Sequence, residues 1–296
     1  MLPRFFLFSS VIFLLMGCRP TGVEAQTRDT GATRPQLGSA TVTSSSPLMP
    51  MVDRGDDPID ILPCTAAAND CTLRSAIALA NNSGEPFTIY FADNLMITLS
   101  APLPPLSANN LTMQAQPGQE VHINANGLGS NVLYITGSNV VVDGLRLYGA
   151  GAGFSNVWVG GTATNVVIAN NVIGEDDAPA GNCGLSELSY GGIYVDAVDV
   201  ANGRSWVWIY NNIIECHHGQ PGDGITIATS GVYVGENKQG SANSSQRNVI
   251  RENAGYAVRL GEHPGNTIRN TLIHDNRSGT IFITNFNNNL LENDIR

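Results

Sequence analysis

The run Asn266-Thr-Ile-Arg-Asn270 returns as Asn289-Leu-Leu-Glu-Asn293, so that every position number rises by 23. A second run, Val249-Ile-Arg-Glu-Asn253, returns as Leu272-Ile-His-Asp-Asn276 with the same shift. Two runs that shift by the same number indicate an internal repeat rather than chance. A fixed period between about 20 and 50 residues is typical of a fold that stacks one short unit on the next.

Each period is filled by short runs of Val, Ile, Leu, Thr and Tyr, separated by Asn, Gly and Ser. Such runs have the length of short strands, and Asn and Gly adopt the left-handed backbone that tight corners require. We therefore predict an all-β, single-stranded, right-handed parallel β-helix over residues 101–296, with one coil per repeat. A corner asparagine in each coil should hydrogen-bond to its counterpart in the next coil.

The period stretches in the middle of the chain, which predicts insertions. Ile168-Ala-Asn-Asn-Val-Ile173 reappears only at a shift of 41, as Ile209-Tyr-Asn-Asn-Ile-Ile214. The excess over one coil predicts an insertion near residues 175–190, and a polar stretch predicts a second one near 236–246. Insertions in such stacked folds usually emerge on one face, and that face often binds a ligand.

The first residues have the pattern of a targeting segment. Arg4 precedes an apolar stretch that is too short to span a bilayer comfortably, so residues 1–17 are predicted to be a cleaved signal peptide. The ending Leu15-Met-Gly-Cys18 resembles a bacterial lipobox, which would make Cys18 the lipidated first residue of the mature protein. The alternative is an ordinary secretory signal with a chance cysteine. Residues 18–55, rich in Thr, Ser, Gly and Pro, are predicted to be a flexible tether.

The remaining four cysteines are even in number, as expected for disulfides in an exported chain. Cys64 and Cys71 enclose a small loop, which favours their pairing and leaves Cys183 with Cys216. Zinc binding by cysteines close to two adjacent histidines is the alternative. The chain lacks a tight Cys-x-x-Cys pair, which argues against a zinc site.

Residues 72–82 form the one clear helix candidate, within a predicted N-terminal cap over residues 56–100. Leu73, Ala76, Ile77 and Ala80 share one face, and Thr72 is the expected N-cap residue. The first coil of a β-helix needs a cover, because its open strand edges would otherwise pair with another molecule. The helix is predicted to be that cover.

The segment Cys71-Thr-Leu-Arg-Ser-Ala-Ile-Ala-Leu-Ala-Asn81 resembles a Cys-Ser-Leu-Arg-Glu-Ala signature in secreted bacterial β-helix proteins of the pectin-lyase-like fold. Ser75 replaces the signature glutamate, which removes the acidic partner of a capping box and predicts a weaker helix start. The resemblance extends over residues 60–296 and implies fold rather than activity. The repeat runs to Arg296 without a closing cap, so either further sequence or a partner is expected to cover the last coil.

Clustered carboxylates are the residues from which a β-helix enzyme would cleave polysaccharides by elimination or hydrolysis. The catalytic candidates are Asp176, Asp177, Asp196, Asp199 and Asp223. Asp223 faintly resembles the Asp-Gly run of polygalacturonases, but the companion motifs of that family are not evident. A turn before the strand Ile225–Ile227 is the alternative interpretation of Asp223.

The repeat also predicts which charges stack. Arg269 would lie one coil before Glu292, and Glu252 one coil before Asp275, about 4.8 Å apart. The first pair would be an opposite-charge rung, whereas the like charges of the second are either tolerated by solvent or bridged by a cation. No cofactor other than calcium is predicted, and the alternative is that these acidic residues lie at corners exposed to solvent. The metal candidates are Glu175, Asp176, Asp177, Glu252 and Asp275.

Aromatic residues indicate a different class of function. Trp206 and Trp208 alternate with Val207 and Ile209, so both tryptophans share one face of a strand and the aliphatic residues share the other. If the aliphatic side chains fill the core, the tryptophans lie outside, where rings can pack against sugars. We therefore predict a carbohydrate-binding surface that consists of Trp206, Trp208 and Tyr210. The alternative is that insertion loops cover these rings.

Composition bounds the function. At 42% hydrophobic and 14% charged residues, with 32 glycines, the chain is too apolar for disorder and too rich in turns for a helical protein. A net charge of −10 argues against a nucleic-acid partner and fits cationic ligands or neutral and calcium-bridged glycans. We predict a bacterial protein, lipid-anchored at the cell surface or outer membrane, that binds polysaccharide or acts as an adhesin-like scaffold. The alternatives are a polysaccharide lyase or glycoside hydrolase, and a structural spacer.

Overall fold

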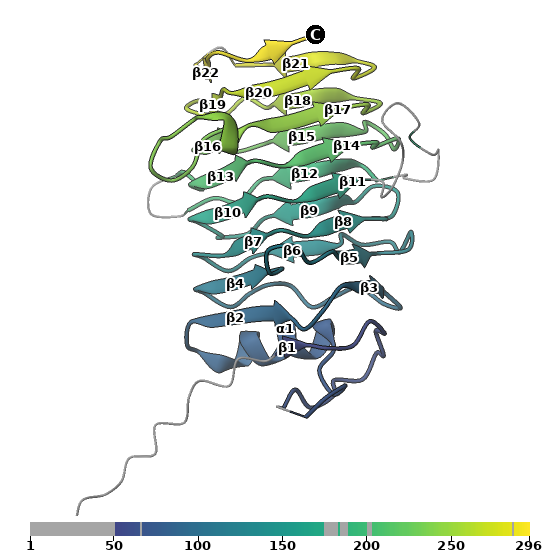
Figure 1. Ribbon diagram of the computed structural model, residues 1–296. Coiled ribbons are helices and arrows are strands. Elements are labelled where there is room, and N and C mark those ends of the chain that lie inside the picture. The colour runs from purple at the N-terminus through teal and green to yellow at the C-terminus, as the bar shows by residue number, and fades with distance from the viewer. Residues whose placement is uncertain (1–50, 66, 175–182, 184–188, 200–202, 286) are drawn as a thin grey trace, which may run out of the picture. The chain divides into compact units, whose positions relative to one another are not determined.

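The computed structural model describes residues 51–65, 67–174, 183, 189–199, 203–285 and 287–296. In this part of the chain, short strands wind through three sheets in which neighbouring strands are parallel (Figure 1). The predicted parallel β-helix is therefore confirmed, with the right-handed sense that connections between parallel strands nearly always take.

Sheets A, B and C contain nine, eight and six strands, and successive strands of the chain visit them in turn. In spatial order, sheet A consists of β1 (Met51–Val52), β2 (Phe87–Phe91), β4 (Leu111–Gln114), β7 (Val141–Asp143), β10 (Val166–Ala169), β13 (Val207–Tyr210), β16 (Val232–Val234), β19 (Thr267–Ile268) and β22 (Asn289–Leu290). Sheet B consists of β3 (Leu95–Thr98), β5 (Val121–Asn124), β8 (Arg146–Tyr148), β11 (Val172–Gly174), β14 (Ile213–Glu215), β17 (Asn248–Arg251), β20 (Thr271–His274) and β23 (Asp294–Ile295). Sheet C consists of β6 (Leu133–Ile135), β9 (Ser155–Val159), β12 (Gly191–Val195), β15 (Asp223–Ile227), β18 (Tyr256–Leu260) and β21 (Gly279–Ile283).

One core runs between the three sheets. The inward side chains of β10, β12 and β14 are Val and Ile residues that are fully or almost fully buried, and they belong to a single hydrophobic cluster. Because side chains alternate along a strand, the intervening residues lie on the outer faces of the sheets. The outer faces are therefore where the chain can vary without disturbing the core.

Asparagines turn the chain at the corners, as predicted. Asn139, Asn165 and Asn170 have φ angles of 59°, 60° and 59°, in the left-handed region that asparagine tolerates better than most residues. The corner between sheets A and B holds a second, buried asparagine in successive coils. The Asn212 side-chain oxygen accepts the Asn171 backbone N–H at 3.0 Å, and the Asn248 oxygen accepts that of Asn212 at the same distance. This ladder satisfies backbone groups that would otherwise be buried without partners.

The spacing between paired strands is less regular than predicted. Tyr256 lies opposite Gly279, a shift of 23, whereas Val166 lies opposite Val207 after the predicted stretch of 41. In the last coil the shift is 22, since Ile268 pairs with Leu290. The predicted rung between Arg269 and Glu292 is therefore wrong.

A different asparagine explains that register. The side-chain oxygen of Asn288, and not that of Asn289, accepts the backbone N–H of Asn266 at 2.9 Å. Arg269 forms its ion pair with Glu236, in the insertion before β17, instead of with Glu292.

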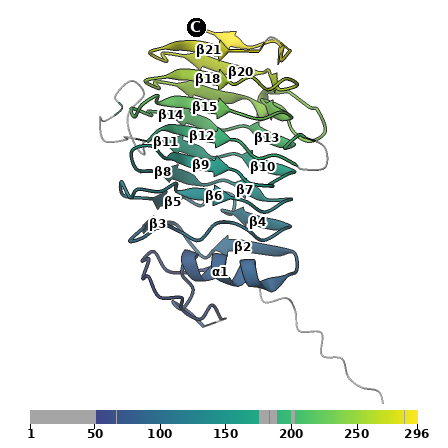
Figure 2. The ribbon, with the colours of Figure 1, turned by 180° about the vertical axis from the view of Figure 1, so that it is seen from behind.

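The predicted capping helix is α1 (Leu73–Ser83), one residue later than predicted, with Thr72 as its N-cap. Figures 1 and 2 both place α1 below β2, at the end of the stack opposite to the C-terminus. Leu73, Ala76, Ile77 and Ala80 are buried as predicted. The Thr72 side chain accepts the Ser75 backbone N–H, and the Ser75 hydroxyl accepts the N–H of Leu62, so Ser75 joins the start of the helix to the preceding loop.

The coils begin earlier in the chain than predicted. Strands β2 and β3 already form part of a coil, so the solenoid starts within the segment that was predicted to be only a cap. Strand β1 pairs with β2, which places Met51 and Val52 in sheet A although they were predicted to belong to the tether. Such short strands, next to polar loops, contain too few alternating apolar and polar residues to be recognised in the sequence.

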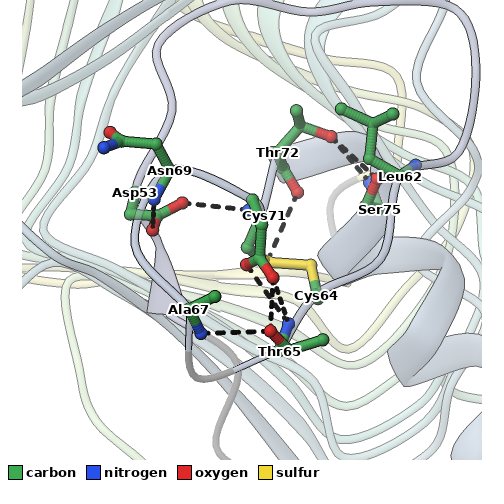
Figure 3. The surroundings of a disulfide bond; sticks show 10 residues. Asp53, Leu62, Cys64, Thr65, Ala67, Asn69, Cys71, Thr72 and Ser75 are labelled. Atoms are coloured by element: carbon green, nitrogen blue, oxygen red, sulfur yellow. Dashed lines mark hydrogen bonds between the residues drawn. A yellow bond between two sulfur atoms is a disulfide. The ribbon is translucent and has the colours of Figure 1, made fainter.

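Both predicted disulfides form, Cys64 with Cys71 and Cys183 with Cys216. Figure 3 shows how the first is held: the Asp53 carboxylate accepts the backbone N–H of Cys71 at 2.9 Å and also that of Asn69. The second joins Cys183 to the corner after β14. Because all four sulfurs are bonded in pairs, the alternative of zinc thiolates does not apply to these cysteines.

The insertion predicted near 236–246 is the connection between β16 and β17, which includes the short helix η1 (Ser244–Gln246). Most of the insertion predicted near 175–190 lies outside the described residues, as do the predicted signal peptide and Cys18. Among the described residues, no helix is long and apolar enough to cross a membrane.

Candidate functional site

The outer face of sheet C carries a row of aromatic side chains. Tyr134, Trp158 and Tyr194 occupy the same position in β6, β9 and β12, so they lie in register on successive coils. The Trp158 ring centroid lies 5.4 Å from those of both tyrosines, tilted by 50° against Tyr134 and nearly perpendicular to Tyr194. All three side chains are half-buried, while their neighbours along each strand are buried in the core.

A cavity of about 290 Å³ opens beside this row. Its acidic residue is Asp196, whose carboxylate accepts a hydrogen bond of 2.7 Å from the indole Nε1 of Trp158. Burial, together with the charge of Asp196, raises the pKa of Tyr194, so its hydroxyl remains a hydrogen-bond donor at neutral pH. The lining residues are Gly153, Ser155, Trp158, Tyr190, Tyr194 and Asp196. We call this set the sheet C site.

Gly160 makes the sheet C site possible. A Cβ atom at this position would lie 2.9 Å from the Trp158 Nε1, 3.0 Å from the Asp196 carboxylate and 3.0 Å from the Tyr134 ring. A side chain there would push apart the groups that hydrogen-bond to each other, so only glycine permits their close approach.

An ion pair continues the same face into the next coils. Asp223 is fully buried at the start of β15, and its carboxylate accepts hydrogen bonds from the Arg259 guanidinium and from the Tyr256 backbone N–H. The hydrogen bond to Asp223 raises the pKa of Arg259. The guanidinium lies 5.1 Å from the ring centroid of Tyr256 and 5.2 Å from that of Phe282. Asp223 therefore fixes a permanent positive charge among aromatic rings.

The predicted catalytic acids are only partly brought together. Asp196 lines the sheet C cavity, whereas Asp223 is buried in the same sheet, as the first residue of a strand rather than the turn that was the alternative. Asp199 follows β12, where its backbone carbonyl accepts the Gly203 N–H at 2.7 Å. Asp176 and Asp177 lie outside the described residues, together with Glu175.

The predicted carbohydrate-binding aromatics lie on the outer face of sheet A. Val207 and Ile209 are fully buried, and Trp206, Trp208 and Tyr210 are half-buried on the opposite side of the strand. The predicted orientation of this strand is therefore confirmed. Burial raises the pKa of Tyr210. Whether these rings bind a sugar stays a prediction.

The predicted stacking of Glu252 with Asp275 matches their places in the fold. The next residues, Asn253 and Asn276, are hydrogen-bonded across the two coils at 2.8 Å, and both acids line one cavity of about 360 Å³. Asp275 also contacts the His274 ring at 2.7 Å. The sulfurs of Cys183 and Cys216 lie close to the Glu252 carboxylate but are bonded to each other. A metal ion at Glu252 and Asp275 stays a prediction.

His217, beside that corner, has a structural role. It is fully buried, and its ring contacts the side chains of Asn253 at 2.6 Å and Asn156 at 3.1 Å. Burial lowers the pKa of His217 to about 4, so the ring is neutral at physiological pH.

Comparison of the sequence with known proteins does not assign the chain to a family. No protein-family model matches the chain, and no curated protein matches it. Among solved structures, one similar chain is Jun a 1, the major allergen from cedar pollen, at 16% identity and a TM-score of 0.36. Another is an alginate lyase from Paenibacillus sp. str. FPU-7, at 17% identity and the same TM-score. Each match covers 74% of this chain, but it spans only 56% of the allergen and 72% of the lyase. A likeness of this size assigns no activity to the chain.

Proposed function

We propose that the protein binds polysaccharide at the sheet C site. The observation that carries this proposal is the cavity lined by Trp158, Tyr190 and Tyr194 together with Asp196, whose carboxylate is hydrogen-bonded to Trp158. Sugar rings present an apolar C–H face and a rim of hydroxyl groups. Aromatic side chains pack against the former, while a carboxylate and tyrosine hydroxyls hydrogen-bond to the latter. A concave, mostly apolar surface with a few convergent polar groups is the usual form of a small-ligand site.

Binding fits the charged residues of this face better than cleavage does. A lyase needs a base that can take up a proton, but the pKa of Arg259 is raised by Asp223, so its guanidinium stays protonated. A hydrolase needs a pair of carboxylates beside the substrate, but Asp223 is buried in the ion pair with Arg259 and does not line the cavity. Because Asp196 lies beside the cavity and Asp223 on the same sheet, a lyase or glycoside hydrolase remains the second candidate.

We further propose that the protein is exported and anchored to the bacterial surface through a lipid on Cys18. Two disulfides support export, since such bonds persist in oxidising compartments. The C18S variant should move the protein from the membrane fraction to the soluble fraction of fractionated cells. If the variant stays with the membranes, the lipid anchor is wrong. An adhesin-like scaffold that holds polysaccharide at the surface combines both proposals.

The test is affinity chromatography or titration with a panel of neutral and acidic polysaccharides, with and without calcium. Wild type should be retained, and Trp158→Ala should weaken retention by about tenfold, as loss of a central aromatic contact typically does. Tyr90→Ala is the matched control, because Tyr90 is a half-buried aromatic in β2, on another sheet. Release of reducing or unsaturated ends would instead support an enzyme. If the protein shows neither binding nor release, the result supports the third alternative, a structural spacer.

A further inference from the structure

A second aromatic surface lies on sheet A. Trp206 directly precedes β13, Trp208 lies within it, and Tyr233 is the residue opposite Trp208 in β16. The inward neighbours Val207, Ile209, Val232 and Val234 are fully buried, so the three rings lie on the outer face. We call them the sheet A surface.

The rings of the sheet A surface form a compact group with a shared orientation. Their centroids are 5.6, 6.0 and 6.4 Å apart, and their planes differ by only 14–24°. In a column of stacked rings the outer two would be about twice as far apart as neighbours. The similar distances instead indicate a triangle of offset, nearly parallel rings, which presents a broad aromatic area rather than the end of a stack.

Two cations lie over rings of this group. The Arg204 guanidinium lies 5.8 Å from the centroid of Trp206, and the Lys238 ammonium lies 5.3 Å from that of Trp208. Lys238 is exposed as a residue, but partial burial of its ammonium lowers the pKa of Lys238, so this group gains from a negatively charged neighbour. In a chain of net charge −10, a pair of cations on one aromatic patch is a local departure from the overall charge.

The loop that carries Lys238 is held in place. Asn243 caps η1 with a capping box, and its backbone carbonyl accepts the Asn270 side chain at 2.7 Å. Arg269 bonds to the Glu236 carboxylate and to the Gly240 carbonyl. The insertion is therefore fastened to the following coil, and it positions Lys238 beside the rings instead of leaving it on a free tail. Preorganised groups lose less entropy when a ligand binds.

We infer that the sheet A surface binds an acidic polysaccharide, whose sugar rings pack on Trp206, Trp208 and Tyr233 and whose carboxylates pair with Lys238 and Arg204. The sheet C site lies on another sheet, with the hydrophobic core between them. One molecule can then hold two polysaccharide chains at once, which suits a scaffold at a cell surface. The inference does not depend on the sheet C site, because no residue is shared.

The test uses polygalacturonate as the acidic probe and a neutral β-glucan as its counterpart. Lys238→Gln should weaken polygalacturonate binding by about fivefold, the size of one partly exposed ion pair, and leave glucan binding unchanged. The loss should shrink at high salt. Trp208→Ala with Tyr233→Ala should abolish the contribution of this surface to both the affinity and the turbidity that bridged chains produce.

Polygalacturonate affinity within twofold of wild type in both variants would overturn the inference, as would equal losses for both probes in Lys238→Gln. Because Lys238 is exposed, that variant folds even if the double aromatic variant does not. Trp158→Ala separates the two proposals. If it alone reduces binding, the sheet C site stands and the inference fails, and if only the sheet A variants do, the reverse holds.

Discussion

The last coils and the middle coils share the ladder of corner asparagines but differ in the residues on the outer faces of their sheets. From β17 to β23 the paired strands follow each other at a shift of 22 or 23, and the candidate site of these coils is the cavity beside Glu252 and Asp275. In the middle coils the shift stretches to 41, and the outer faces gain aromatic rings, a cavity and a buried ion pair. The comparison teaches that the aromatic candidate sites lie where the repeat is loosened.

The largest contrast should appear between two aspartates. Asp223→Ala leaves Arg259 and the Tyr256 N–H without their buried partner, so it should lower the free energy of unfolding by about 3–5 kcal/mol. Asp294 is its counterpart in the last coil, where it pairs with Arg247 and Arg296 at the surface. Asp294→Ala should have a much smaller effect, because solvent screens this surface pair. Denaturant titration measures both, and equal losses would remove the distinction between the two regions.

A pH titration sharpens the same contrast. The pKa of His217 is about 4 in the folded protein and near 6.5 when unfolded, so between these values the unfolded chain binds more protons. The stability from burying neutral His217 is complete above about pH 6.5 and declines as pH falls towards 4, by about 3 kcal/mol in all. His217→Gln should flatten this slope, whereas the control His274→Gln, from the last coils, should keep it. A slope that survives His217→Gln contradicts the assignment.

The asparagine ladder should contribute more to the free energy of unfolding in the middle coils than in the last coil. Asn212 is almost fully buried, and its side chain bonds to the Asn171 N–H and the Ile168 carbonyl. Asn212→Ala should cost about 2 kcal/mol, since it leaves buried polar groups unpaired. Asn293 plays the same part for Thr271 in the last coil but is less buried, and Asn293→Ala should cost about half as much. Thermal unfolding of the two variants, measured side by side, shows which substitution lowers stability more.

The smallest effect concerns Gly160. A methyl group there would crowd the side chains of Trp158 and Asp196, which can shift, so the cost should be about 1 kcal/mol, at the low end for overpacking. Because the strain falls on the sheet C site, Gly160→Ala should weaken polysaccharide binding while the protein stays folded at room temperature. Gly129→Ala is the control, since its nearest contact would be an ordinary 3.9 Å from the Phe154 ring. Unchanged binding in Gly160→Ala would show that Trp158 and Asp196 need not be close.

Much of the fold could be predicted, because its causes are local. Alternating apolar residues, corner asparagines and the Cys71–Asn81 segment each act within a short stretch of chain. The register of the last coil could not, because three consecutive asparagines, 287–289, offer equivalent ladder residues to the sequence. Only the stacked coil selects Asn288.

The sheet C site was predicted only in part, through Asp196, for a related reason. The intervals between Tyr134, Trp158 and Tyr194 are unequal, so no fixed period aligns these rings until the strands pair. Asp223 was visible as an acid, but its partner Arg259 lies in the next coil and only the register joins them. The tryptophans of sheet A could be predicted to lie outside because their alternation with Val207 and Ile209 is contained in one strand.

Binding of the full chain to immobilised polysaccharides, compared between wild type and Trp158→Ala, tests the central claim most directly. The sheet C site predicts measurable retention on at least one polysaccharide, weakened about tenfold in Trp158→Ala and unchanged in Tyr90→Ala. Circular dichroism that matches wild type would confirm that the variant is folded. Retention that is the same in all three proteins would contradict the claim that the sheet C site binds polysaccharide.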